Sequence, residues 1–157
     1  MSVDSRLESL KAWLDGCLPE VFAARGWGVP GPASLTPASS DASFRRYFRW
    51  EDGARSLIVM DAPPPQEDCR PFVRVAGLLA QAGVHVPEIL AGDLAQGFLL
   101  LPDLGRQTYL EVIGEDNADA LFEDALQALV AFQRLPVEGQ LPAYDEALLR
   151  RELQLFP

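Results

Sequence analysis

The order of the elements predicted between residues 39 and 105 constrains the fold of this chain more than any other feature. A small polar stretch is followed by a strand hairpin, an amphipathic helix and a second hairpin, whose apolar strand ends at Pro102-Asp103-Leu104-Gly105. Alternation of apolar and polar side chains predicts the strands, and apolar side chains at three- and four-residue spacing predict the helix. Glycine or proline marks the turns. Strands that are followed by helices indicate an α+β fold.

The pattern predicts a five-stranded antiparallel sheet with one helix inserted after the third strand. The third strand contains the run 57–60, which is apolar on both faces, as expected for a central strand. The predicted strands cover residues 35–38, 44–50, 56–62, 86–92 and 98–101, and the helix covers 68–81. Alternation gives the second strand two faces, one with Phe44, Phe48 and Trp50 and the other with Arg45, Tyr47 and Arg49.

Helices are predicted before and after the sheet region in the sequence. The first begins at a capping box of Ser5 and Glu8, and Gly16 and Pro19 are expected to break or kink it. Residues 26–32 form a loop, and residues 108–113 and 117–135 form helices after the sheet. A last helix is capped by Asp145 and keeps an apolar face up to the end of the chain. We therefore expect a piece of a longer protein, whose isolated chain can self-associate through that face.

Charge and composition exclude several classes of protein. The 157 residues carry a formal charge of -10, which repels a phosphate backbone, so nucleic acid is not an expected partner. Cys17 and Cys69 are far apart and lack metal-ligand spacing, which argues against a disulfide framework or a zinc site. The sequence contains neither a signal peptide pattern nor a run of about 20 apolar residues. A cytoplasmic protein without membrane contact is therefore expected.

Four segments carry a resemblance to a known family: 39–49, 58–64, 86–90 and 97–105. In this order they resemble the aminoglycoside-phosphotransferase-like small-molecule kinases. Among these, they are similar to the bacterial anomeric sugar kinases that phosphorylate N-acetylmuramate and N-acetylglucosamine in cell-wall recycling. The resemblance implies three segments: N-terminal helices at 1–32, a protein-kinase-like small lobe at 33–105, and the start of a helical large lobe at 106–157. It also implies transfer of the γ-phosphoryl group of ATP, with Mg²⁺, to the hydroxyl of an amino sugar.

The resemblance also implies where ATP binds. In kinases of this kind the sheet covers the adenine, the loop after the first strand contacts the phosphates, and the segment after the last strand offers main-chain groups to the adenine edge. The nucleotide-binding residues implied for this chain are Ser39, Ser40, Asp41, Ala42, Ser43, Arg45, Arg49, Met60, Leu101, Pro102, Asp103 and Leu104.

One departure from kinases concerns the phosphate-binding cation. Many kinases use a third-strand lysine that pairs with a helix glutamate, whereas this strand has Met60 and Asp61, so the usual ion pair is not expected. The nearest cations are Arg45, Arg46 and Arg49, and our hypothesis is that Arg45 replaces the lysine, as the second-strand lysine does in the with-no-lysine kinases. The alternative is that these arginines are solvated on an exposed hairpin.

A second departure concerns catalysis. The family places its catalytic aspartate and magnesium ligands in the large lobe, in a His-x-Asp loop and a later aspartate motif. The single histidine, His85, lies in a predicted turn and no His-x-Asp occurs, so we expect no catalytic residue and no metal ligand here. Asp103 either orients its own segment or caps the helix at Thr108. A non-catalytic nucleotide-binding or interaction module, and a structural domain without ligand, remain open as alternatives.

Overall fold

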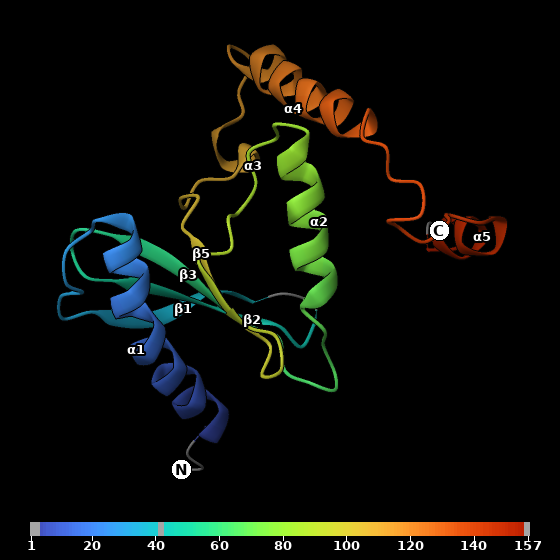
Figure 1. The fold of residues 1–157 in the computed structure, drawn as a ribbon. Helices are drawn as coiled ribbons and strands as arrows, with labels where there is room; N and C mark the ends of the chain where they lie inside the picture. Colours follow the sequence, from blue (N-terminus) through green and yellow to red (C-terminus); the bar gives the residue numbers. More distant parts are fainter. Residues whose placement is uncertain (1–3, 41–42, 156–157) are drawn as a thin grey trace.

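A five-stranded antiparallel sheet forms the centre of the fold (Figure 1). The computed structural model describes residues 4–40 and 43–155. The strands are β1 (Ser34–Ser40), β2 (Arg46–Glu51), β3 (Ser56–Asp61), β4 (Ala91–Asp93) and β5 (Phe98–Pro102), in the spatial order β1-β2-β3-β5-β4. One helix, α2 (Arg70–Gln81), is inserted after β3. The predicted α+β architecture with one inserted helix is therefore confirmed.

Helix α1 (Ser5–Arg25) packs across one face of the sheet. Its buried side chains repeat at three- and four-residue spacing, and Phe22, which is 1% exposed, makes edge contacts with Trp27 and Trp50. Burial of such a side chain stabilises the fold by roughly 1.5–3 kcal/mol. The sheet contributes to this core the alternate side chains Phe48, Trp50, Leu57, Val59, Phe98 and Leu100.

The predicted capping box of α1 was wrong, and of the predicted break or kink near Pro19 the break does not occur. The N-cap is Asp4, whose carboxylate accepts a hydrogen bond from the amide of Leu7 at 3.0 Å, so no capping box at Ser5 begins the helix. Pro19 lies inside the helix without ending it, and the segment before the sheet contains one continuous helix in the part of the chain that is described. The buried side chains of Leu14 and Leu18 before Pro19, and of Val21 and Phe22 after it, hold the helix together despite the missing amide donor.

The opposite face of the sheet packs against α2 (Figure 1). Met60, Leu99 and Leu101 form this second core, with Phe72 and Val73 of α2 packed against it. The two cores contain alternate residues of β3 and β5, because successive side chains of a strand point to opposite faces.

The fourth strand is much shorter than predicted. Of the predicted range 86–92, only the end pairs regularly, in β4, although the amide of Leu90 donates to the carbonyl of Leu100 at 2.8 Å. Pro87 has no amide hydrogen to donate, which explains why a ladder does not extend toward it. Gly97 closes the β4–β5 turn, and a Cβ atom there would lie 1.9 Å from the carbonyl oxygen of Ala62.

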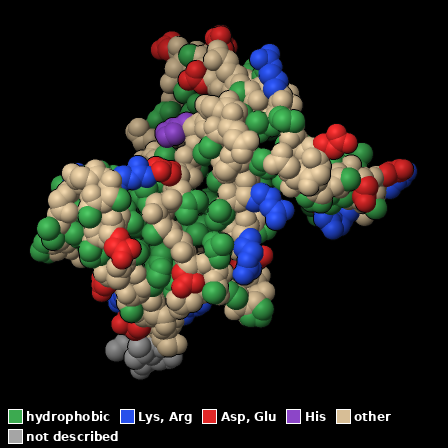
Figure 2. Space-filling view, in the orientation of Figure 1, with side chains coloured by type: hydrophobic (Ala, Val, Ile, Leu, Met, Phe, Trp, Pro, Cys, Tyr) green, Lys and Arg blue, Asp and Glu red, His purple; other side chains and the backbone are tan. Residues whose placement is uncertain are grey.

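Three further helices follow the sheet: α3 (Tyr109–Val112), α4 (Ala118–Gln133) and α5 (Glu146–Leu153). Asp145 caps α5 as predicted, because its carboxylate accepts from the amide of Leu148 at 2.8 Å. None of these three helices has a buried residue, and α4 and α5 extend away from the sheet (Figure 1). Hydrophobic side chains reach the surface over this region (Figure 2), including Phe122 and Leu153, each 60% exposed. No described helix is both long and apolar enough to cross a bilayer.

Candidate functional site

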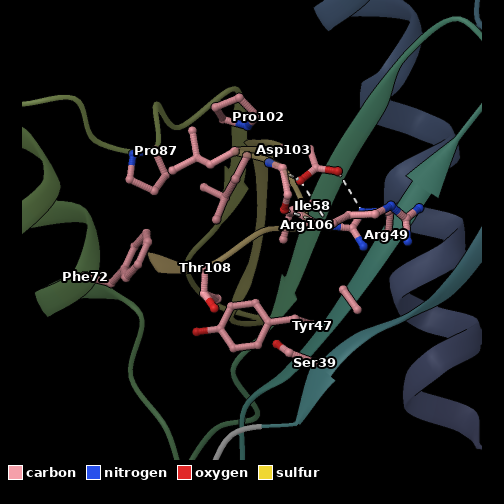
Figure 3. A pocket seen from close by; sticks show the side chains of 14 residues that line it. Ser39, Tyr47, Arg49, Ile58, Phe72, Pro87, Pro102, Asp103, Arg106 and Thr108 are labelled. Carbon is pink, nitrogen blue, oxygen red and sulfur yellow. Dashed lines mark hydrogen bonds and ion pairs between the residues drawn. The ribbon is translucent and has the colours of Figure 1, made fainter. Parts of the chain in front are cut away.

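A cavity of about 590 Å³ lies on the α2 side of the sheet, beside residues 102–105, which we name the hinge segment (Figure 3). Strand β5 leads directly into this segment, and Phe72 of α2 and Pro87 line the other side. We name this space the hinge cavity. Its lining residues are Ala38, Ser39, Tyr47, Arg49, Ile58, Phe72, Pro87, Leu101, Pro102, Asp103, Leu104, Gly105, Arg106 and Thr108.

The sheet register determines which side chains reach the hinge cavity. Arg49 pairs with Ile58, and Ile58 pairs with Leu101, so these three side chains form one row across the sheet. The next row contains Tyr47 and Met60. Tyr47 projects into the cavity (Figure 3), whereas Met60 is fully buried in the core beneath α2 and does not line the cavity.

Arg49 and Asp103 join β2 to the hinge segment through an ion pair (Figure 3). The Nε atom of Arg49 donates to Oδ2 of Asp103 at 2.7 Å and Nη2 donates to Oδ1 at 3.2 Å, and both side chains are about nine-tenths buried. Asp103 also accepts from the hydroxyl of Ser56 and from the amide of Gly105 at 2.9 Å. The guanidinium of Arg49 and these other donors hold the pKa of Asp103 far below its usual range.

This geometry decides between the two roles considered for Asp103. Thr108 is the N-cap of α3 and forms a capping box with Glu111, so Asp103 does not cap that helix. Asp103 instead fixes the hinge segment, because it binds the amide of Gly105 while Arg49 donates to the carbonyl of the same residue at 3.2 Å. The hinge segment is thereby held in one conformation against β2 and β3.

Arg46 points to the other face of the sheet and does not line the hinge cavity. Its guanidinium donates to the fully buried carboxylate of Asp61 at 2.6 Å and 2.9 Å, and it also binds Asp4. Arg6 of α1 donates to the second oxygen of Asp61 at 2.7 Å. This cluster fastens the start of α1 to the sheet, so we assign Arg46 a structural role.

Arg45 precedes β2 on the cavity side of the strand. Its Nε atom donates to Oε2 of Glu67 at 3.0 Å, and the same carboxylate accepts from the amide of Phe44 at 3.2 Å. Burial lowers the pKa of Arg45, but its hydrogen bonds to Tyr47 and Glu67 outweigh that effect and raise it. Arg45 therefore remains charged. An arginine–glutamate pair thus joins the residue before β2 to the loop after β3.

Arg45 lines a second, apolar cavity of about 330 Å³ that adjoins the hinge cavity. Phe72 and Pro87 line both cavities, so the path from the hinge segment to Arg45 runs along one side of α2. Arg45, Arg46 and Arg49 thus each pair with a carboxylate from a distant part of the chain, and none is a freely solvated side chain on an exposed hairpin.

The predicted phosphate loop is only partly described. Ser39 lines the hinge cavity, Ser40 ends β1, and the hydroxyl of Ser43 accepts from the amide of Arg45 at 3.2 Å. Asp41 and Ala42 lie outside the described residues. The nucleotide-binding role of the whole set stays a prediction.

The structure gathers some predicted residues around the hinge cavity and adds others. Ser39, Arg49 and residues 101–104 line it as a group, whereas Arg45 lies in the adjoining cavity and Met60 in the core. The sequence reasoning did not select Tyr47, although alternation along β2 places it on the same face as Arg49. Phe72 and Pro87 were not selected as site residues either, because tertiary packing brings the segments that carry them to this side of the sheet.

Comparison with known proteins gives consistent similarities. The whole chain is 73% identical to the N-acetylmuramate/N-acetylglucosamine kinase of Pseudomonas aeruginosa and covers 46% of that protein. The protein of the same name from Pseudomonas putida is 61% identical over 98% of this chain, and the match covers 45% of that relative. The protein of the same name from Neisseria meningitidis is 39% identical over 94% of this chain, and the match covers 42% of that relative. The chain thus spans about half the length of these curated relatives.

A sequence model of the phosphotransferase enzyme family matches residues 34–157. The match begins at the first residue of β1 and includes every residue that lines the hinge cavity. Because it extends over most of the chain, this protein belongs to the phosphotransferase enzyme family.

Proposed function

We propose that this chain is the ATP-binding part of a kinase that transfers the γ-phosphoryl group of ATP to an amino sugar, N-acetylmuramate or N-acetylglucosamine, in cell-wall recycling. In this proposal residues 33–105 are the small lobe and residues 106–157 begin the large lobe. The hinge cavity is the observation that carries the proposal, because an apolar space beside a fixed main-chain segment suits a purine. The names of the relatives support the choice of acceptor.

The base is placed at the hinge end of the cavity. Ile58 and Leu101 offer an apolar surface to a purine ring, and Tyr47 and Phe72 add aromatic walls. The amide and the carbonyl of Gly105 are occupied by Asp103 and Arg49, so the proposal assigns the base edge to the main chain of residues 102–104. Arg49 and Asp103 position this segment.

The phosphates are placed near Arg45, at the other end of the strand. Arg45 lies four positions before Arg49, a span of roughly 13 Å at 3.3 Å per residue, which suits an extended nucleoside triphosphate. Ser39 and Ser43 flank the loop that leads to Arg45. The charge of Arg45 takes the place of the absent third-strand lysine in neutralising the phosphates.

Among the described residues no group of three or more His, Cys, Asp or Glu side chains could hold a metal ion. The proposal assigns the Mg²⁺ ligands and the catalytic aspartate to the large lobe, as the family resemblance implies. Mg²⁺ would neutralise charge on the phosphates there. This chain supplies the base-binding surface and one phosphate-binding cation.

The acceptor is tested by mass spectrometry of the full-length protein incubated with ATP, Mg²⁺ and either amino sugar. We expect a phosphorylated sugar. No phosphorylated product with either sugar would contradict the proposed acceptor, while ATP-dependent phosphorylation of another small molecule would keep the kinase and change its substrate.

The phosphate-binding role of Arg45 is tested by Arg45→Ala in the full-length protein. ATP affinity, measured by titration calorimetry, should fall by several-fold or more, because one cation at the phosphates is lost. Arg74→Ala is the matched control, since Arg74 is exposed on α2 and lines neither cavity. Unchanged ATP binding in Arg45→Ala would rule out this role.

A further inference from the structure

Arg45 does not stand alone beside the predicted phosphate loop, because Glu67 binds it and the main chain next to it. We propose that Glu67 is a positioning residue that fixes the guanidinium of Arg45 for phosphate binding; this inference rests on the proposed function. Glu67 lies in the loop between β3 and α2 and is not part of the helix.

The carboxylate of Glu67 makes two different contacts. Oε2 accepts from Nε of Arg45 at 3.0 Å, and Oε1 accepts from the amide of Phe44 at 3.2 Å. The first contact orients the side chain and the second fixes the main chain that carries it. Glu67 is the more enclosed partner, with its side chain 13% exposed, against 29% for Arg45. Arg45 is thus reachable by a ligand, while the residue that holds it is shielded.

The loop that carries Glu67 is locally constrained. Three consecutive prolines, residues 63–65, precede it, and proline restricts the backbone. The amide of Glu67 donates to the carbonyl of Pro63 at 2.9 Å, and Cys69 anchors the end of the loop in the core with 1% exposure. Glu67 therefore offers a fixed carboxylate, whereas arginine has a long and flexible stem.

The third strand explains why a fixed arginine is needed. Met60 is fully buried and uncharged, and the next side chain, Asp61, is enclosed by Arg6 and Arg46 on the other face. The cation must therefore come from the neighbouring strand. Glu67 engages Nε of Arg45, and among the described residues no other carboxylate binds this guanidinium. Tyr47 also hydrogen-bonds this guanidinium, and an Nη group can still meet a phosphate oxygen while Nε stays bound to Glu67.

A competing role would be that Glu67 occupies Arg45 until ATP displaces it. The contact with the Phe44 amide argues against this role, because it holds the carboxylate in place independently of Arg45. The two roles predict opposite changes in ATP affinity when the carboxylate is removed, since positioning predicts a loss and competition predicts a gain.

The test compares Glu67→Gln with the parent in the full-length protein. Titration calorimetry measures affinity for ATP and for adenosine, which lacks phosphates. We expect ATP affinity to fall roughly tenfold, the effect of one charge-assisted hydrogen bond, and adenosine affinity to stay within about twofold. In an Arg45→Ala background, Glu67→Gln should change ATP affinity by less than about twofold, because a positioning residue acts through its partner.

Two further variants control for nonspecific damage. Glu8→Gln removes an exposed Glu8–Lys11 pair on α1 and should leave both affinities unchanged. Glu67→Asp keeps the charge and should retain more ATP affinity than Glu67→Gln. Unfolding temperatures without ligand show whether each variant is folded.

The outcomes separate this inference from the proposed function. An ATP affinity that is unchanged or raised in Glu67→Gln overturns the inference. An equal loss of ATP affinity from Glu67→Gln in the parent and in the Arg45→Ala variant also overturns it. So does a greater loss of ATP affinity in Glu67→Asp than in Glu67→Gln. If the parent protein binds neither ATP nor adenosine, the proposed function fails and the inference fails with it.

Discussion

At the scale of single residues, the buried pair of Arg49 and Asp103 has the strongest influence on the candidate site. It joins β2 to the hinge segment, and Ser56 and Gly105 satisfy further hydrogen bonds of the same carboxylate. Removing one member of a buried pair leaves the other charge uncompensated, which costs far more than breaking an exposed pair. The position of the hinge segment therefore depends on Asp103 remaining ionised.

We predict that Asp103→Asn lowers the free energy of unfolding by about 3 kcal/mol at neutral pH, because Arg49 is left buried without its carboxylate. The pKa of Asp103 is depressed in the folded protein, so its stabilisation is fully present above the unfolded pKa of about 3.9 and is lost as the pH falls below it. The difference in the free energy of unfolding between the parent and Asp103→Asn should therefore shrink below about pH 4. Urea unfolding at a series of pH values measures it.

Asp68→Asn is the control for this prediction, because Asp68 and Arg70 form a pair whose side chains are 51% and 61% exposed. Loss of such a pair costs at most about 1 kcal/mol. Equal losses for Asp68→Asn and Asp103→Asn, or a loss for Asp103→Asn that does not depend on pH, would contradict the account of the buried pair.

At the scale of elements, the sequence predicted the existence and order of strands and helices better than their ends. Strands β1, β2, β3 and β5 and helix α2 follow directly from side-chain periodicity. Helix α1 shows the limit, because Pro19 is a local signal to break a helix, and the buried side chains of Leu18 before it and of Val21 and Phe22 after it outweigh that signal. The fourth strand forms but is shorter than predicted, since Pro87, near its predicted start, cannot donate to a ladder.

We predict that Pro19→Ala raises the free energy of unfolding by about 1–3 kcal/mol. Alanine restores an amide donor inside α1 and removes a ring that crowds the preceding turn, and Pro19 is exposed, so little packing is lost. Chemical denaturation measures the change, and Glu20→Ala, at the next exposed position, should alter it by less than about 0.5 kcal/mol. A destabilised Pro19→Ala variant would show that the proline contributes to the packing of α1.

At the scale of the whole molecule, the sheet and the helices after it differ in burial. The sheet has a core on each face, whereas α3, α4 and α5 have no buried residue. Periodicity in the sequence predicted the apolar faces of α4 and α5. Their surroundings could not be predicted, because burial is a property of contacts between elements.

The candidate site shows the same division between local and distant information. Arg49, Leu101 and Asp103 were selected because the family resemblance implied nucleotide-binding roles for them, and the structure brings them to one cavity. Glu67 could not be selected, because it lies 22 residues from Arg45 in a loop without periodicity. Contacts of this kind depend on how β2 and the loop before α2 meet in three dimensions.

A crystal structure of the full-length protein with Mg²⁺ and a non-hydrolysable ATP analogue tests the central proposal most directly. The account predicts the purine between Ile58 and the hinge segment, with at least one phosphate oxygen within hydrogen-bond distance of Nη1 or Nη2 of Arg45. A purine bound outside the hinge cavity, or phosphates held by another cation with Arg45 unengaged, would contradict it.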